Sequence, residues 1–207
     1  MIRKIVAVCL IWVCCGLALA EEENSFVTVT PIFNQLLRHS LPSNFETVFE
    51  DSKNQQYIRE AVLKGENVNK WSQMITVTGA KGLASNSNIT PRVFAGQIAN
   101  GFQLVCPSSF SNSGPGDTKF GTNDGFVVVI SCGTANPMDK YSESMLLVVI
   151  KGDSDYYTVQ WSERGELSGK PIPVDQEKWM ARLKKLMPIK LCTRVAGEPA
   201  PYPSCLN

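Results

Sequence analysis

The chain has little of the chemistry on which most enzymes and metal sites depend. His39 is the single histidine among 207 residues. Imidazole-based zinc and iron centres, Ser-His-Asp triads and Cys-His pairs would all have to use it. It lies in the polar stretch Arg38-His39-Ser40, ahead of the first strongly predicted strand. We therefore expect a solvated loop histidine and not a catalytic base.

Phosphate-binding and hydrolase motifs are also absent from the sequence. It contains no Walker loop, no G-x-G-x-x-G, no G-x-S-x-G and no S-x-x-K. We therefore expect no cofactor and no nucleotide, and the sequence favours a protein that is not an enzyme. The 20 basic and 19 acidic residues nearly balance, so we expect no nucleic-acid partner either, because such partners require a basic surplus.

The longest apolar run is too short for a membrane span. Residues 5–20 give 16 positions, whereas a spanning helix needs about 20. Arg3 and Lys4 precede this run, and Ala18-Leu19-Ala20 ends it as an A-x-A cleavage site. We predict a removable signal peptide over 1–20, in preference to a membrane anchor. The remainder, 21–207, is of single-domain size, and we expect it to be periplasmic or secreted, with no membrane span after cleavage.

The cysteines support the same compartment. Three of the seven lie in the predicted leader, and Cys106, Cys132, Cys192 and Cys205 remain. An even number in an oxidising compartment favours two disulfides, for which three pairings exist. We favour Cys106–Cys132 and Cys192–Cys205. The alternative, a four-cysteine zinc site, lacks the usual C-x-x-C spacing, so no metal is expected.

Hydrophobic periodicity predicts an α+β fold in which a curved antiparallel sheet of about six strands packs with two main helices. Thr90 and Pro91 supply a strong helix start. Residues 107–124, rich in Ser, Asn and Gly, are expected to form a long loop. The predicted strands are 45–50, 57–62, 73–78, 126–131, 144–150 and 156–161, and the predicted helices are 91–104 and 175–187.

Two segments and the order of the elements resemble known proteins. The segments are Gly65-Glu66 to Trp71-Ser72-Gln73-Met74-Ile75-Thr76-Val77 and Ile150-Lys151-Gly152-Asp153 to Tyr157-Thr158-Val159-Gln160-Trp161. They resemble small exported bacterial proteins of unassigned activity. The element order resembles, more distantly, the PsbP/Mog1-type α+β sandwich, whose members are mostly binding or assembly proteins. This resemblance implies a binding role and supplies no catalytic residues.

The candidate binding surface is the 107–124 segment together with one sheet face. It includes Phe110, Asp117, Asn123 and Asp124. The spacing of the three polar residues is not that of a calcium loop and is typical of an ordinary polar turn. Tyr156 is the aromatic residue that we expect on the exposed face of its strand. The partner is expected to be a protein or a component of the cell envelope.

Carboxylates provide the alternative function, a hydrolase of carbohydrate or peptidoglycan. Glu143 precedes an apolar strand, and antiparallel pairing about Gly152 brings it towards Arg164. The sequence predicts a partly buried ion pair between them, structural more often than functional. The acids available to such a hydrolase are Glu60, Glu143, Asp153, Asp155, Glu163 and Glu166.

Overall fold

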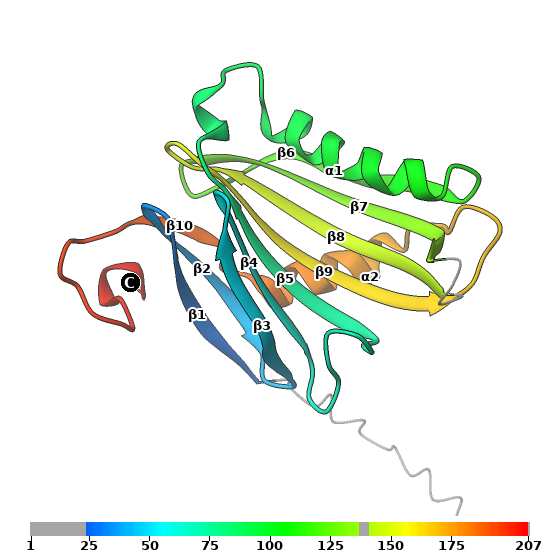
Figure 1. Ribbon diagram of the computed structural model, residues 1–207, viewed down its shortest axis with the longest axis horizontal. Coiled ribbons are helices and arrows are strands. Elements are labelled where there is room, and N and C mark those ends of the chain that lie inside the picture. Colours follow the sequence, from blue (N-terminus) through cyan, green and yellow to red (C-terminus); the bar gives the residue numbers. More distant parts are fainter. Residues whose placement is uncertain (1–23, 137–140, 207) are drawn as a thin grey trace, which may run out of the picture.

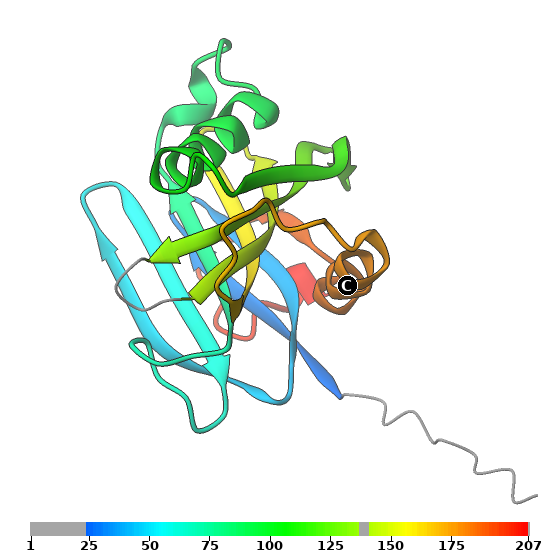
Figure 2. The ribbon, with the colours of Figure 1, turned by 90° about the vertical axis from the view of Figure 1, so that its right-hand side faces the viewer.

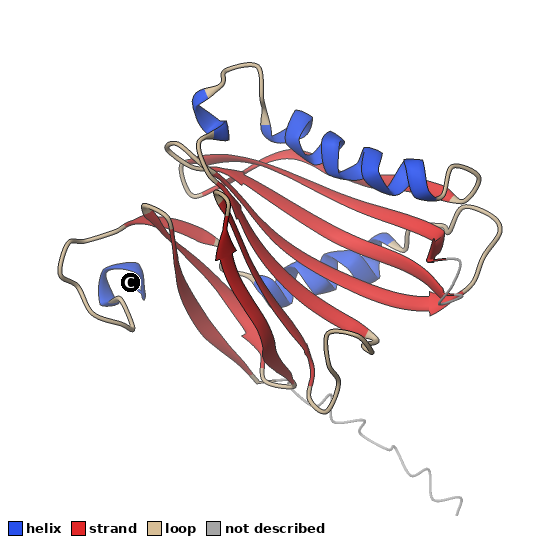
Figure 3. Ribbon diagram, viewed as in Figure 1, coloured by secondary structure: helices blue, strands red, loops and turns tan. Residues whose placement is uncertain are grey.

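The structure is a computed structural model, and it describes residues 24–136 and 141–206. The predicted signal peptide lies outside the described residues. Figure 1 shows two antiparallel sheets, and Figure 3 shows helices lying against the strands. The prediction of an α+β fold with an antiparallel sheet of about six strands is confirmed, since the larger sheet has seven strands among the described residues. The smaller sheet, of three strands, was not predicted.

The larger sheet has seven strands in the order β3-β4-β5-β9-β8-β7-β6, and the smaller has the order β1-β2-β10. Consecutive strands of the larger sheet are mostly neighbours, as in a meander. The single crossover carries the chain from β5 through α1 to β6 at the far edge. The bounds are β1 Ser25–Ile32, β2 Gln35–Pro42, β3 Phe45–Lys53, β4 Gln56–Leu63, β5 Gln73–Ala80, β6 Phe110–Phe120, β7 Asn123–Asn136, β8 Tyr141–Lys151, β9 Tyr156–Glu166 and β10 Lys190–Thr193.

The helices cover opposite faces of the larger sheet, as Figure 2 shows. Helix α1, Pro91–Val105, begins where predicted, and the Thr90 hydroxyl accepts the Val93 N–H. Helix α2, Gln176–Leu186, is capped by Asp175. A 3₁₀ turn over Leu83–Ser85 and a C-terminal turn, α3 Pro203–Leu206, complete the elements.

Central strands β7 and β8 are buried on both faces, which explains their nearly continuous apolar sequence. Val128 and Leu147 face the core under α1, whereas Val129 and Leu146 face the core under α2. The second core is larger because the smaller sheet also packs against it, through side chains that include Leu37.

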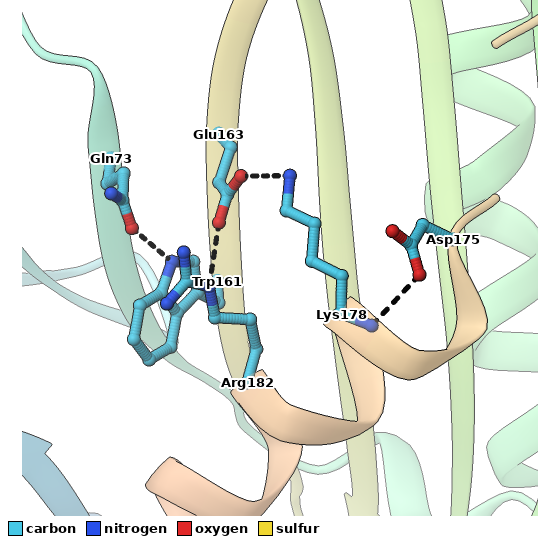
Figure 4. Close-up of polar contacts among 6 residues, drawn as sticks. All are labelled: Gln73, Trp161, Glu163, Asp175, Lys178 and Arg182. Carbon is cyan, nitrogen blue, oxygen red and sulfur yellow. Dashed lines mark hydrogen bonds and ion pairs between the residues drawn. The ribbon is translucent and has the colours of Figure 1, made fainter. Parts of the chain in front are cut away.

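Ion pairs attach α2 to strand β9 (Figure 4). The Glu163 carboxylate lies 2.5 Å from the Lys178 ammonium and 2.8 Å from the Arg182 guanidinium. Arg182 also covers the ring of Trp161, whose indole N–H donates to the Gln73 side-chain oxygen at 3.0 Å. These contacts fix the orientation of α2 against the sheet.

Both predicted disulfides are present. Cys106–Cys132 joins the end of α1 to β7, and Cys192–Cys205 joins β10 to the C-terminal turn. The cysteines of the first pair are each 1% exposed.

The structure contradicts the predictions for one segment and two residues of this part of the fold. The 107–124 segment is not a loop, because its residues 110–120 form β6. His39 is not a solvated loop residue either, since it lies in β2 and is 1% exposed. Finally, Tyr156 is completely buried: its ring stacks on Phe94 of α1 at 4.7 Å, because α1 covers the face that the tyrosine occupies.

Candidate functional site

Strand β6 is an edge of the larger sheet and pairs only with β7. The backbone groups on its other side are therefore available for hydrogen bonding. Its pairing with β7 shifts between Ser113 and Gly116, which marks a β-bulge. A Cβ atom at Gly114 would lie 2.7 Å from Val128 Cα, so only glycine fits this close approach.

Side chains in the first part of β6 are hydrogen-bonded to the segment that leads into α2. The Ser111 hydroxyl donates to the Ile172 carbonyl at 2.7 Å, and the Gln176 amide donates to the Ser113 hydroxyl at 2.9 Å. Beyond the bulge, none of the described residues forms a backbone hydrogen bond with the outer side of 116–120. The open edge therefore spans five residues, about 17 Å.

An apolar cavity of about 310 Å³ lies between this open edge and α2. Phe120 is buried at its base, and Met187, just after α2, is 43% exposed. The helix supplies two half-buried side chains, Met180 and Leu183. The full lining is Pro115, Thr118, Lys119, Phe120, Val127, Met180, Leu183, Lys184 and Met187.

The charged side chains around the cavity are basic. Lys119 and Lys184 both line it. Lys119 forms an ion pair with Asp124 at 2.7 Å, in which both side chains are about two-thirds exposed. Such an exposed pair holds its partners weakly, about 0–1 kcal/mol. A negatively charged group beside the cavity would therefore compete readily for both lysines.

The predicted binding residues surround β6 but do not form the cavity. Phe110 packs with the core under α1. Asp117 forms an ion pair with Arg92, Asp124 pairs with Lys119, and the Asn123 amide donates to the Lys151 carbonyl at 3.0 Å. These polar side chains are thus bonded to residues of α1, β6 and β8 and hold the β6–β7 hairpin in place.

The sequence predicted the helix over 175–187 but did not identify Met180 and Leu183 as residues that line a cavity. Trp179 and Leu186 do face the core, at 3% and 0% exposure. The sequence did contain an indication of this second contact, because the apolar stripe of α2 is wider than packing against the core alone requires.

Glu143 and Arg164 lie directly opposite each other on β8 and β9. No direct ion pair joins their side chains in the described part of the chain. The Ser162 hydroxyl is hydrogen-bonded to Glu143, and the Arg164 guanidinium lies against Trp71 and Tyr141. Burial raises the pKa of Glu143, although the Arg164 charge and the Ser162 hydrogen bond oppose this shift.

The two carboxyl groups with raised pKa do not form a hydrolase-like pair. Burial also raises the pKa of Glu60 on β4. Strands β5 and β9 separate β4 from β8, so the side chains are three strand spacings apart, about 14 Å. A glycosidase pair is separated by about 5–10 Å. Among the described residues, no cluster of three or more His, Cys, Asp or Glu side chains is arranged to hold a metal ion.

Comparison with known proteins found no matching family model and no matching curated protein. Solved structures do match. A Bacteroides thetaiotaomicron VPI-5482 protein is 14% identical with a TM-score of 0.41, and the match covers 80% of this chain. This chain spans 47% of that protein's length.

Two further structures match over most of their length. The Saccharomyces cerevisiae Ran-binding protein Mog1p is 7% identical, covers 80% of this chain and 86% of its own, and has a TM-score of 0.42. LpqN, involved in cell envelope biogenesis of Mycobacterium tuberculosis, is 13% identical, with 81% and 92% coverage and a TM-score of 0.38. Mog1, whose fold type the element order resembled, is thus among the structural neighbours. We take no function from matches at these TM-scores.

No helix of the described residues has the length and apolar character that crossing a membrane requires.

Proposed function

We propose that this chain is an exported binding module, without catalytic activity of its own, that holds an extended segment of a partner protein along β6. The observation that carries the proposal is the position of the 310 Å³ apolar cavity directly beside the open edge of that strand. An edge strand and a side-chain cavity are the two parts that recognition by strand addition requires.

The strand edge and the cavity have different roles in recognition. The backbone of 116–120 bonds to the backbone of the added strand, which provides affinity with little dependence on sequence. Side chains of the added strand alternate between faces, so every second residue points towards α2. One of these residues enters the cavity and provides specificity.

The cavity lining indicates the chemistry of the partner segment. Met180, Leu183 and Met187 form an apolar wall, and methionine side chains adapt to anchors of different shape. Lys119 and Lys184 favour an acidic residue next to the anchor. The proposed ligand is therefore an extended peptide with one large apolar residue flanked by Asp or Glu.

Two features support export. The predicted leader would direct the chain out of the cytosol, and two disulfides suit an oxidising compartment.

Panning a phage-displayed peptide library on residues 21–207, with both disulfides formed, tests the proposal. We expect the enriched peptides to share an apolar anchor with acidic neighbours. A selected peptide should slow hydrogen exchange of amides within 116–120. Met180→Glu places a charge in the cavity and should weaken binding of that peptide at least tenfold.

The matched control is Val195→Glu, because Val195 is 50% exposed and lies outside the cavity. This variant should bind the selected peptides as tightly as the wild type does. The proposal is wrong if the selected peptides leave exchange along 116–120 unchanged, or if Met180→Glu and Val195→Glu bind them equally well.

A further inference from the structure

Arg164 lies against two aromatic rings at the end of the sheet where β8 begins and β9 ends. Its guanidinium carbon is 3.8 Å from the Trp71 ring centroid and 4.0 Å from the Tyr141 ring centroid. The guanidinium is thus in contact with both rings. Cation–π attraction to each ring restrains the position of the group.

The backbone holds the same three residues together. The Arg164 N–H donates to the Ser72 carbonyl at 2.9 Å, which fixes β9 beside the segment that carries Trp71. Tyr141 is the first residue of β8, next to β9 in the sheet. Arg164 and Tyr141 thus lie in adjacent strands, and Trp71 lies in the segment just before β5, which is held to β9 by this hydrogen bond.

The guanidinium borders an open cavity and retains bonding capacity. A cavity of about 600 Å³ lies beside it, lined also by Lys70 and Glu166. Arg164 Nε is buried and has no hydrogen-bond partner among the described residues. The N–H groups of a guanidinium form a planar fork, the geometry that suits a carboxylate.

We infer that Arg164, Trp71 and Tyr141 form a binding site for a small organic carboxylate, separate from the β6 surface. The charges decide between a carboxylate and a phosphate. Among the residues that line the cavity, Lys70 and Arg164 against Glu166 leave one net positive charge, which a monoanion neutralises. A dianion would leave the cavity with a net negative charge.

Three probes that share a phenyl ring but differ in head group test this inference: benzoate, benzamide and phenylphosphonate. Benzoate should shift the NMR signal of the Arg164 Nε–H saturably, with a dissociation constant of about 1–10 mM, as expected for nine non-hydrogen atoms. Benzamide and phenylphosphonate should bind at least tenfold more weakly. This measurement uses the unmodified protein, so it does not depend on any variant folding.

Two variants locate the site. Arg164→Lys keeps the charge but loses the planar fork, and it should weaken benzoate binding at least tenfold. Arg194→Lys makes the same change at an exposed arginine outside this cavity and should have no effect. The inference is overturned if benzoate leaves the Arg164 signal unmoved, if phenylphosphonate binds as tightly as benzoate, or if both lysine variants bind benzoate like the wild type.

Discussion

His39 is a buried base whose protonation opposes folding. Its Nδ1 lies 2.9 Å from the Ser40 carbonyl, which only accepts, so the proton of the neutral ring is on Nδ1. Its Nε2 lies 3.4 Å from the Arg59 guanidinium and accepts from it. Burial lowers the pKa of His39 to about 4, with a further contribution from the Arg59 charge.

This histidine makes the protein less stable in acid. From about pH 6.5 down to about pH 4, the unfolded chain binds a proton that the folded chain does not, so the unfolding free energy falls as pH falls. The full decrease in the unfolding free energy is about 3 kcal/mol. Urea unfolding at pH 7.0 and pH 4.5 measures it.

The control is His39→Gln, which has no titrating ring. The unfolding free energy of this variant should change less between the two pH values than that of the wild type. Equal changes in the two proteins would contradict a depressed pKa at His39.

At the scale of elements, replacing a glycine by alanine should have opposite effects on stability in β6 and in α1. A Cβ at Gly114 meets the backbone of Val128 at 2.7 Å, whereas a Cβ at Gly96 in α1 meets nothing within 4 Å. Gly114→Ala should therefore cost about 1–3 kcal/mol through crowding. Gly96→Ala should add about 0.5–1 kcal/mol, because alanine favours a helix. Chemical denaturation of both variants gives the comparison, and a stable Gly114→Ala protein would refute the close packing of the bulge.

Elements with strong patterns were predictable, whereas those that depend on distant partners were not. Helix α1 has Thr90, Pro91 and apolar spacing, so its start was evident. Strand β6 is exposed on an edge and rich in glycine and serine, so it has no apolar alternation. Pairing with β7 makes it a strand.

The candidate site combines both situations. The helical wall, 176–186, was predicted from the sequence, whereas the strand wall, 110–120, was expected to be part of a loop. That they meet is a property of the sheet order, in which the crossover through α1 places β6 at the edge above α2. Sequence periodicity does not contain this information.

For the whole molecule, the disulfides limit how far the chain expands when unfolded. The loop closed by Cys106–Cys132 spans 26 residues, and that closed by Cys192–Cys205 spans 13. Loop entropy predicts losses of about 3.5 and 3 kcal/mol when each is removed. Thermal unfolding of the two double Cys→Ala variants tests this. A loss well below 1 kcal/mol for either pair would show that its bridge constrains little.

Pairing in the smaller sheet sets the order in which parts of the chain can fold during synthesis. Strand β2 pairs with β10, so residues near 36 complete their pairing only after residues near 191 have been synthesised. Leu36 and Leu37, completely buried in the finished protein, emerge early and stay uncovered until the last segment arrives. A nascent polypeptide of this kind is at risk of aggregation during that interval, and a holdase that shields its amino-terminal hairpin would raise the yield of native molecules.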